Sequence, residues 1–290
     1  MLSQEKNERL TEVGPGTPMG NLLRRYWWPV ATHDMAGRVP VRRRLLSEDL
    51  VLFRDASGKL GLLAEQCPHR RASLALGCTE RTGLRCGYHG WLFDTDGRCL
   101  EQPGEPADST FADRIRATSY PVAELGQIRV PVDDTHTWHV WYQTYRFAAP
   151  APPQRAIPVY RVPLHDTQGE WLRDYVDGQD ICAWVTQGAI ADRTREHLGR
   201  SDLGVIMLRK LYFEQMELVE AGHDPICTYR DPARNACIDL PMEREKFGGA
   251  QAFRDVWLHE SSIRYSPIRD EVLSQFGDAP RHADAASVAG

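Results

Sequence analysis

The residues with the clearest chemistry are two short groups that each pair a cysteine with a histidine. Cys67-Pro68-His69 is followed, after sixteen intervening residues, by Cys86-Gly87-Tyr88-His89. Thiolates and neutral imidazoles are both good metal ligands. The spacers of one and two residues allow both side chains of a loop to point at the same centre. The sequence therefore predicts a metal centre that takes one Cys and one His from each of two loops.

Ligands in this arrangement suit a Rieske [2Fe–2S] cluster, in which two thiolates hold one iron and two imidazoles hold the other. We assign Cys67 and Cys86 to one iron and His69 and His89 to the other. The alternative is a structural zinc site, which also takes two Cys and two His but usually groups like ligands together. Because each group here mixes the two types, the pattern favours the cluster over a zinc-stabilised, non-redox interaction module.

The seven cysteines are too few and too unevenly placed for a disulfide framework. Cys67, Cys78, Cys86 and Cys99 lie close together with His69 and His89, whereas Cys182, Cys227 and Cys237 have no histidine at ligand spacing. We expect the metal centre between residues 67 and 99, and we expect Cys78 and Cys99 to be free thiols.

The composition is that of an ordinary globular chain, with 42% hydrophobic and 26% charged residues over 290 positions. A formal net charge of −5 argues against nucleic acid as a partner. No apolar run approaches the roughly 18 residues that cross a membrane. The first residues lack a basic and then apolar leader. We therefore expect a cytoplasmic protein with no membrane and no nucleic-acid partner.

Short β-strands must position the ligands. Runs typical of strands stand at residues 26–33, 41–46, 50–54, 60–66, 99–102, 120–123, 127–132 and 135–147. Residues 55–58 and 94–97 both end in a glycine and are typical of hairpin turns. These runs predict a small antiparallel sheet.

The chain changes character after these strands. The proline-rich residues 148–153 predict a loop, since proline cannot donate to a β-ladder. Apolar residues then recur at steps of three and four, which predicts an amphipathic helix over 202–221 that ends at Gly222: these are Leu208, Leu211, Tyr212, Met216 and Val219. We interpret this stripe as core packing and expect the tail beyond Gly277 to be frayed.

Residues 1–127 resemble the N-terminal Rieske domain of aromatic-ring-hydroxylating oxygenases, close to the phthalate dioxygenase-like group. The resemblance rests on residues 15–20, 26–29 and 90–94, together with the ligand groups. It implies a mainly β, ISP-type Rieske domain over 1–132. It also implies a low-potential cluster that takes electrons from a flavin-containing reductase or a ferredoxin and passes them to a mononuclear Fe(II) that activates O₂. A homo-oligomer is a further partner that the family allows.

Residues 128–290 resemble the C-terminal end of the same group's catalytic domain, so the middle of that domain is missing. We expect residues 133–290 to form a shortened α+β remnant, with residues 127–132 replacing the strand that closes the Rieske sheet. Whether the shortening is natural cannot be read from the sequence.

The missing part should have contained the catalytic iron. The family places two histidines at four- or five-residue spacing and a distant Asp around that iron, a 2-His-1-carboxylate triad. No remaining histidine pair here has that spacing. Asp134 with His136, or Asp192 with His197, could each form half a site, but surface roles are the simpler interpretation. His139 lies three residues from His136 in a predicted strand and should face the other side. We predict that oxygenase turnover by this chain alone fails; the alternative is a complete oxygenase with an unconventional iron site.

Two basic groups could dock an acidic reductase. They are Arg42–Arg44 and Arg70–Arg71, and a solvated charged face is the plainer interpretation of each. Trp91 is expected to pack against the ligand loops.

Overall fold

The computed structural model describes residues 2–32, 35–106, 108–122, 129–140, 157–231 and 261–275. The chain forms two compact units: unit 1 combines Met1–Gln143 with Ala189–Arg230, and unit 2 combines Thr144–Gly188 with Asp231–Gly290. Both units are therefore discontinuous in sequence. The predicted loop at 148–153 and the tail beyond Gly277 lie outside the described residues.

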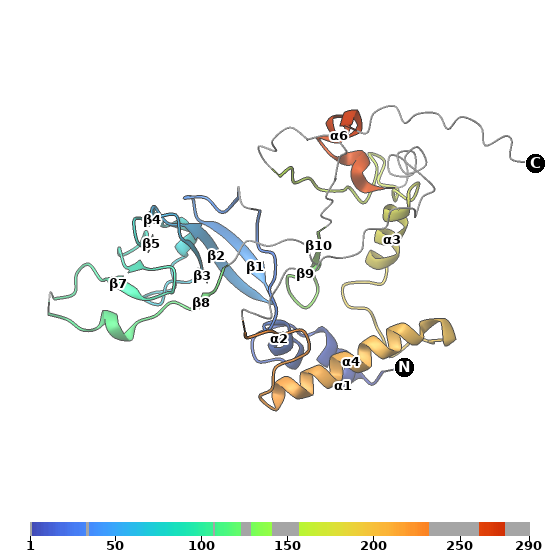
Figure 1. The fold of residues 1–290 in the computed structure, drawn as a ribbon, viewed down its shortest axis with the longest axis horizontal. Helices are drawn as coiled ribbons and strands as arrows, with labels where there is room; N and C mark the ends of the chain where they lie inside the picture. Colours follow the sequence, from blue (N-terminus) through green and yellow to red (C-terminus); the bar gives the residue numbers. More distant parts are fainter. Residues whose placement is uncertain are drawn as a thin grey trace, which may run out of the picture. The chain divides into compact units, whose positions relative to one another are not determined.

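A four-stranded antiparallel sheet with the order β1-β2-β3-β8 forms the first layer of unit 1 (Figure 1). Its strands are β1 (Val41–Leu45), β2 (Glu48–Arg54), β3 (Leu60–Ala64) and β8 (Ser119–Tyr120). In the turn between β2 and β3, the Asp55 carboxylate accepts hydrogen bonds from the backbone N–H groups of Ser57 and Lys59, both at 2.9 Å. Gly58 there has a φ of +93°, which favours glycine. The predicted strands and turn between residues 41 and 66 are thus confirmed.

A second antiparallel sheet, β4-β5-β6-β7, carries the second ligand group. Its strands are β4 (Cys78–Glu80), β5 (Gly83–Arg85), β6 (Leu92–Phe93) and β7 (Cys99–Glu101). The predicted turn at 94–97 joins β6 to β7, with Gly97 at a φ of +79°. The strand predicted at 99–102 is confirmed as β7. The sequence analysis missed β4, β5 and β6, because two or three residues are too few to show an alternating pattern.

The two sheets share one hydrophobic core. It contains Val51, Phe53, Leu63, Leu74, Leu84, Trp91, Phe93, Ala117 and the cysteines Cys67, Cys86 and Cys99. Phe53 on β2 and Phe93 on β6 are fully buried. Each such burial contributes about 1.5–3 kcal/mol. Gly61 on β3 makes room for Phe53, since a Cβ there would lie 2.5 Å from the ring. This core fixes the strands from which the ligand loops emerge.

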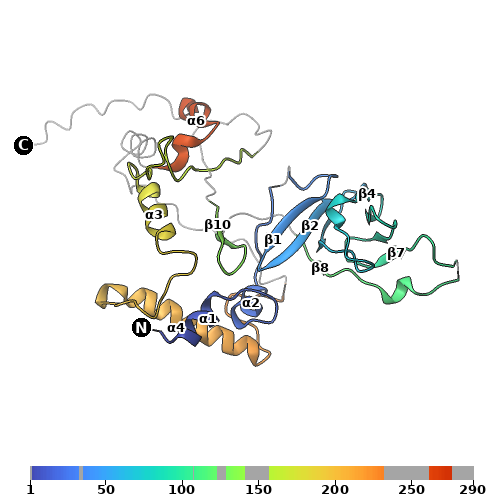
Figure 2. The same ribbon diagram turned by 180° about the vertical axis from the view of Figure 1, so that it is seen from behind.

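Three helices form a second core in unit 1, and both views show them together (Figures 1 and 2). They are α1 (Gln4–Thr11), α2 (Pro18–Leu23) and α4 (Leu203–Glu220). Met216 and Val219 of α4 are buried, and Gly222 follows the helix with a φ of +84°. The predicted helix is confirmed. The prediction that the whole apolar stripe of this helix packs in the core is wrong for Leu208 and Tyr212, which are 49% and 37% exposed. The buried residues of the stripe all lie in the C-terminal half of α4, because only that half contacts the other helices of this core.

Three predicted strands need correction. Residues 26–32, the described part of the run predicted at 26–33, form no strand. The strand predicted at 127–132 does not close the main sheet, because β8 occupies the edge beside β3. Instead β9 (Arg129–Pro131) pairs with β10 (Thr137–His139) in a separate hairpin. Of the strand predicted at 135–147, residues 141–147 lie outside the described residues. The hairpin meets the β1–β2 turn through the Leu46 N–H, which donates to the Pro131 carbonyl at 3.0 Å.

Unit 2 contains a buried tyrosine in contact with a second aromatic ring. The helices described in this unit are α3 (Val176–Val185) and α6 (Arg269–Gln275), with a 3-10 helix, η6, at Ser262–Tyr265. Tyr175 is fully buried and stands edge-on to Tyr265 at 6.0 Å between ring centroids. The Arg264 guanidinium lies over the Tyr175 ring at 4.4 Å and pairs with Asp174 at 2.6 Å. A mainly β N-terminal part followed by a helix-containing part agrees with the predicted fold class.

Further 3-10 helices of unit 1 are η2 (Leu74–Leu76), η3 (Ala112–Arg114) and η4 (Arg200–Asp202). Among the helices that the structure describes, none combines the length and the apolar character needed to span a membrane.

Candidate functional site

The two ligand groups lie on loops that are built alike. In the first loop the Cys67 N–H donates to the Ala72 carbonyl at 2.8 Å, and the Arg71 N–H donates to the Cys67 carbonyl at 2.9 Å. In the second loop the Cys86 N–H donates to the carbonyl of residue 91 at 2.9 Å, and the N–H of residue 90 donates to the Cys86 carbonyl at 3.1 Å. Both loops therefore close over the same number of residues, with the cysteine at the base of each.

The fifth position of each loop has a left-handed backbone. Arg71 has a φ of +63° and Gly90 a φ of +79°. This conformation costs a non-glycine residue roughly 1–2 kcal/mol, so the fold holds Arg71 in a strained turn. The shared frame presents one cysteine from each loop at the same position, and one histidine from each loop at the third position in the first loop and the fourth in the second.

The thiols and imidazoles of these pairs lie in different environments. Cys67 and Cys86 are buried in the core, 1% and 3% exposed. His69 is exposed and His89 half-buried, and their ring centroids lie 4.6 Å apart. The indole of Trp91 stacks on the His69 ring at 4.3 Å and 7° between planes, which confirms the predicted packing of Trp91 on the loops. The loops thus place two sulfurs inward and two imidazoles outward.

Among the causes that shift the pKa of the buried Cys67 thiol, burial is the largest. It raises the pKa of the Cys67 thiol to about 11; the backbone N–H groups of His69 and Arg70 oppose this, and the neighbouring Cys86 adds to it. On the outer side, desolvation lowers the pKa of His89, as do the nearby His69 and Arg70. A neutral imidazole is the ligating form. A metal centre would supply the positive charge that the buried thiolates lack.

Arg85, immediately before Cys86, holds the second loop from outside. Its guanidinium donates to the Gly90 carbonyl, one residue after His89. It also donates to both carboxylate oxygens of Glu80 and, at 2.6 Å, to Glu101. The side chain therefore ties β4, β5, β7 and the far end of the loop together. The sequence analysis missed Arg85; its place directly before a ligand cysteine was the available signal.

The donor set fits a two-iron cluster better than a single ion. Within the ranges that the structure describes, no three Cys, His, Asp or Glu side chains converge as a single-ion site requires. A tetrahedral zinc site needs its four ligands around one point. A Rieske cluster needs two ligands at each of two irons. A buried pair of thiols opposite an outer pair of imidazoles has that form.

Three of the other candidate ligands, Asp134, His136 and Asp192, have partners within the fold. Asp134 accepts a hydrogen bond from the Val13 N–H at 2.8 Å and anchors the start of α2's loop to the hairpin. The His136 ring contacts Asp133 at 2.9 Å, and His139 lies on β10. Asp192 accepts from Thr194 in a local turn. His197 is exposed. The structure does not bring these residues together as a metal site.

The first basic group and two of the remaining cysteines also have surroundings that show their roles. In the first basic group, Arg42 pairs with Glu65 at 2.6 Å, Arg43 donates to the Val30 carbonyl, and Arg44 pairs with Asp49. Cys78 and Cys99 are free thiols as predicted, the first exposed and the second buried.

Comparisons with known proteins match both halves of the chain. A family model described as Rieske [2Fe-2S] domain matches residues 26–121, and one described as LigXa C-terminal domain like matches residues 174–238. The chain is 32% identical over 369 aligned positions to the 5,5'-dehydrodivanillate O-demethylase oxygenase subunit of a Sphingobium species, covering 83% of this chain and 87% of the relative. It is 38% identical over 208 positions to the phthalate 4,5-dioxygenase oxygenase subunit of Pseudomonas putida, covering 70% of this chain and 43% of the relative.

Among solved structures, apo dicamba monooxygenase is similar to 36% of this chain, at 30% identity and a TM-score of 0.34, over 32% of its own length. The alignment with the demethylase subunit is longer than this chain of 290 residues, so that relative has residues without a counterpart here. The chain also spans less than half of the phthalate dioxygenase subunit.

Proposed function

This chain belongs to the Rieske non-haem iron oxygenase family, an oxidoreductase family, and we propose that Cys67, His69, Cys86 and His89 hold its [2Fe–2S] cluster. The observation that carries the ligand assignment is the pair of matched loops, with two buried thiols and two outer imidazoles. When bound, such a cluster accepts and releases one electron.

The chain's own residues prepare this chemistry in four ways. Burial of Cys67 and Cys86 keeps water from the sulfurs, and backbone N–H groups of the first loop point at the Cys67 sulfur. Such hydrogen bonds stabilise negative charge on sulfur and tune a cluster's potential. Trp91 fixes the plane of the His69 ring by stacking on it. The outer histidines leave one side of the site open to a redox partner.

We propose further that residues 1–132 form the Rieske module and that residues 133–290 are a shortened catalytic domain. The two matched family regions and the length of the demethylase alignment support this division. The family's mononuclear Fe(II) would belong to the shortened part. We propose that this chain alone transfers electrons but does not complete oxygenase turnover. Members of the family take electrons from a reductase or a ferredoxin and often oligomerise, and we propose the same kind of donor here, in the cytoplasm.

Metal and sulfide analysis of the purified chain, combined with electron paramagnetic resonance, tests the proposal. We expect two irons and two sulfides per chain and a Rieske-type signal after reduction. Alanine at any one of the four ligand positions should abolish the signal, whereas Cys78→Ala and Cys99→Ala should preserve it. One zinc without iron would show the interaction module instead, and a third iron would show a complete oxygenase. A signal retained in Cys86→Ala would refute the ligand assignment.

A further inference from the structure

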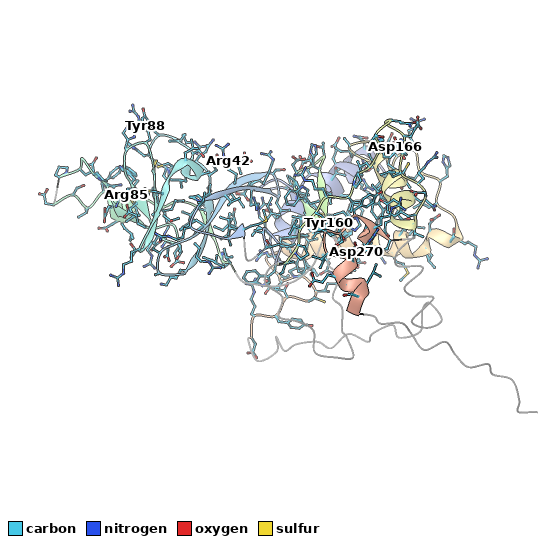
Figure 3. The ribbon with its side chains drawn as sticks, turned by 90° about the horizontal axis from the view of Figure 1, so that it is seen from above. Arg42, Arg85, Tyr88, Tyr160, Asp166 and Asp270 are labelled. Atoms are coloured by element: carbon cyan, nitrogen blue, oxygen red, sulfur yellow. The ribbon has the colours of Figure 1, made fainter. Side chains whose placement is uncertain are left out.

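A cavity of about 320 Å³ lies in unit 1, between α2, α4 and the segments that follow these two helices. This volume is in the range of small-molecule sites in proteins, which are mostly apolar with a few polar groups. None of the lining residues belongs to the ligand loops, the second of which is marked by Arg85 and Tyr88 in Figure 3. Aromatic rings form much of the wall: Tyr26, Trp27, Trp28 and Tyr212.

Hydrogen bonds hold the walls of this cavity in place. The Ile226 N–H donates to the Gln215 Oε1 at 2.8 Å, and the Ile226 carbonyl accepts from the Tyr26 hydroxyl at 2.9 Å. The indole N–H of Trp28 donates to the Leu23 carbonyl at 2.7 Å. The cavity is therefore bounded by segments that are fixed by hydrogen bonds as well as by apolar packing.

Gln215 supplies an unused hydrogen-bond donor to the cavity that it lines. Its side chain is buried, with only 6% of the residue exposed. Since the Ile226 N–H can only donate, the amide oxygen of Gln215 faces it and the amide nitrogen is left for another acceptor. Among the described residues this nitrogen has no hydrogen-bond partner, and it is not sealed off as the unpartnered Gln102 Nε2 is. A buried donor without a partner is costly, so a ligand that carries an acceptor would satisfy it.

The charge of the surroundings narrows the class of ligand. Within the described ranges, no charged side chain lines the cavity. Arg25, next to Tyr26 in sequence, pairs with Asp224 at 3.9 Å, and Asp224 also pairs with Arg230 at 2.6 Å. An anion would therefore lose its hydration here without gaining a cation. Flat apolar surface suits the aromatic walls, because aromatic rings pack well against one another.

We propose that this cavity binds a small, flat and uncharged molecule with one hydrogen-bond acceptor, such as an aryl ketone. The acceptor would take the free N–H of Gln215, and the ring would lie among the aromatic side chains. Binding is reversible, and no covalent bond forms or breaks. The site is separate from the metal chemistry of the chain, since its lining contains no Cys, His, Asp or Glu. The inference does not depend on the proposed function.

The test compares three compounds of similar size by calorimetry with the full, cluster-loaded chain. Acetophenone carries a carbonyl acceptor, ethylbenzene has the same ring without an acceptor, and benzoate carries a negative charge. We expect acetophenone to bind saturably and ethylbenzene to bind about fivefold more weakly, the factor that corresponds to one net hydrogen bond. Benzoate should bind roughly tenfold more weakly than acetophenone or worse, because no cation compensates its charge.

Gln215→Glu tests the donor without removing the bond that holds the wall. A glutamate oxygen still accepts from the Ile226 N–H, but the side chain no longer offers an N–H to the ligand. We expect acetophenone to bind this variant no more tightly than ethylbenzene does. A general loss of packing would weaken both compounds and would not remove the preference between them.

A matched pair of substitutions on α4 tests the location. Leu211 lines the cavity, whereas Leu208, three residues earlier on the same helix, is 49% exposed and is not part of the lining. Leu211→Trp should fill the cavity and weaken acetophenone binding by roughly tenfold or more. Leu208→Trp should leave the affinity within about twofold of the unmodified chain. If Leu211→Trp does not fold, the comparison in Gln215→Glu tests the site by itself.

The proposed site would be refuted if acetophenone shows no saturable binding, or if it binds the unmodified chain no better than ethylbenzene. Equal binding of acetophenone to Leu211→Trp and Leu208→Trp would also contradict it, because the compound would then bind elsewhere. A dimer in sedimentation that Leu211→Trp abolishes and Leu208→Trp preserves would assign the cavity to a second copy of this chain instead of a small molecule.

Discussion

Replacing Arg85 by methionine removes the side chain that holds the second ligand loop without touching a ligand. The change deletes the hydrogen bond to the Gly90 carbonyl and the ion pairs with Glu80 and Glu101. A hydrogen bond from a charged donor is worth about 1.5–3 kcal/mol. The ion pairs add little, at most about 1 kcal/mol each, because the Glu80 and Glu101 side chains are 38% and 57% exposed.

The expected destabilisation of the loop is therefore about 2–4 kcal/mol. Even a loss of about 2 kcal/mol raises the population of the open loop about 30-fold, since each 1.4 kcal/mol corresponds to a factor of ten. Opening exposes the ligands Cys86 and His89, so we expect cluster loss to a chelator to accelerate by about the same factor. The decay of the visible circular dichroism of the cluster measures this rate.

Two further variants identify the cause. Arg85→Lys keeps the charge but lacks the planar fork that bonds several acceptors at once, so its rate of cluster loss should lie between those of the wild type and the methionine variant. Glu101→Gln removes the most exposed ion pair and should change the rate less than threefold. Cluster loss at the wild-type rate in Arg85→Met would show that the loop is held by its own backbone bonds, and the reasoning would be wrong.

Three more predictions follow from the site. Gly90→Ala should destabilise the chain by about 1–2 kcal/mol in chemical unfolding, since Gly90 has a φ of +79°, whereas Gly37→Ala, at a position with open space and an ordinary backbone, should change it little. The hydrogen bond from Arg85 lowers the pKa of Glu80, so the stability that this bond contributes is present above the ordinary carboxyl pKa and is lost as the pH falls below that value. The stability of Glu80→Gln should therefore fall less steeply with pH in this acid range than that of the wild type. With a reductase, NADH and a panel of benzoates and phthalates, the cluster should be reduced but no ¹⁸O from labelled O₂ should enter any of these compounds. Incorporation coupled to NADH consumption would contradict the proposal that this chain does not complete oxygenase turnover.

The proposed ligand residues could be identified from the sequence because their signal is local. Cys67 with His69, and Cys86 with His89, lie within single loops, so their spacing alone carries the pattern. The hairpin turns were predictable for the same reason, since glycine marks the left-handed position in each. Arg85 was not found, because its importance comes from acceptors on β4, β7 and the end of the loop, which are brought together by pairing and not by spacing.

The wrong strand predictions have a related cause. Residues 127–132 have the composition of a strand, but composition does not show which strand such a run pairs with. Here β8 pairs with β3, and of the run predicted at 120–123 only Tyr120 lies in this strand. The apolar stripe of α4 likewise predicted the helix correctly but the burial of its residues only in part. The sequence does not show how much of a helix packs against other elements.

The local construction of the site also explains how it would persist in a chain whose catalytic domain is shortened, as we propose. The bonds that frame both ligand loops come from residues between 65 and 101, and the core beneath them comes from the two sheets of the same module. One link from this module to the helices is Glu48, which accepts a hydrogen bond at 2.7 Å from Arg24, the residue that follows α2. Glu48 and Arg24 lie before residue 126, as do all residues of the two ligand loops. A shortening of the catalytic domain after that point, as we propose, would therefore leave in place the backbone hydrogen bonds and the Arg85 bonds that frame both loops.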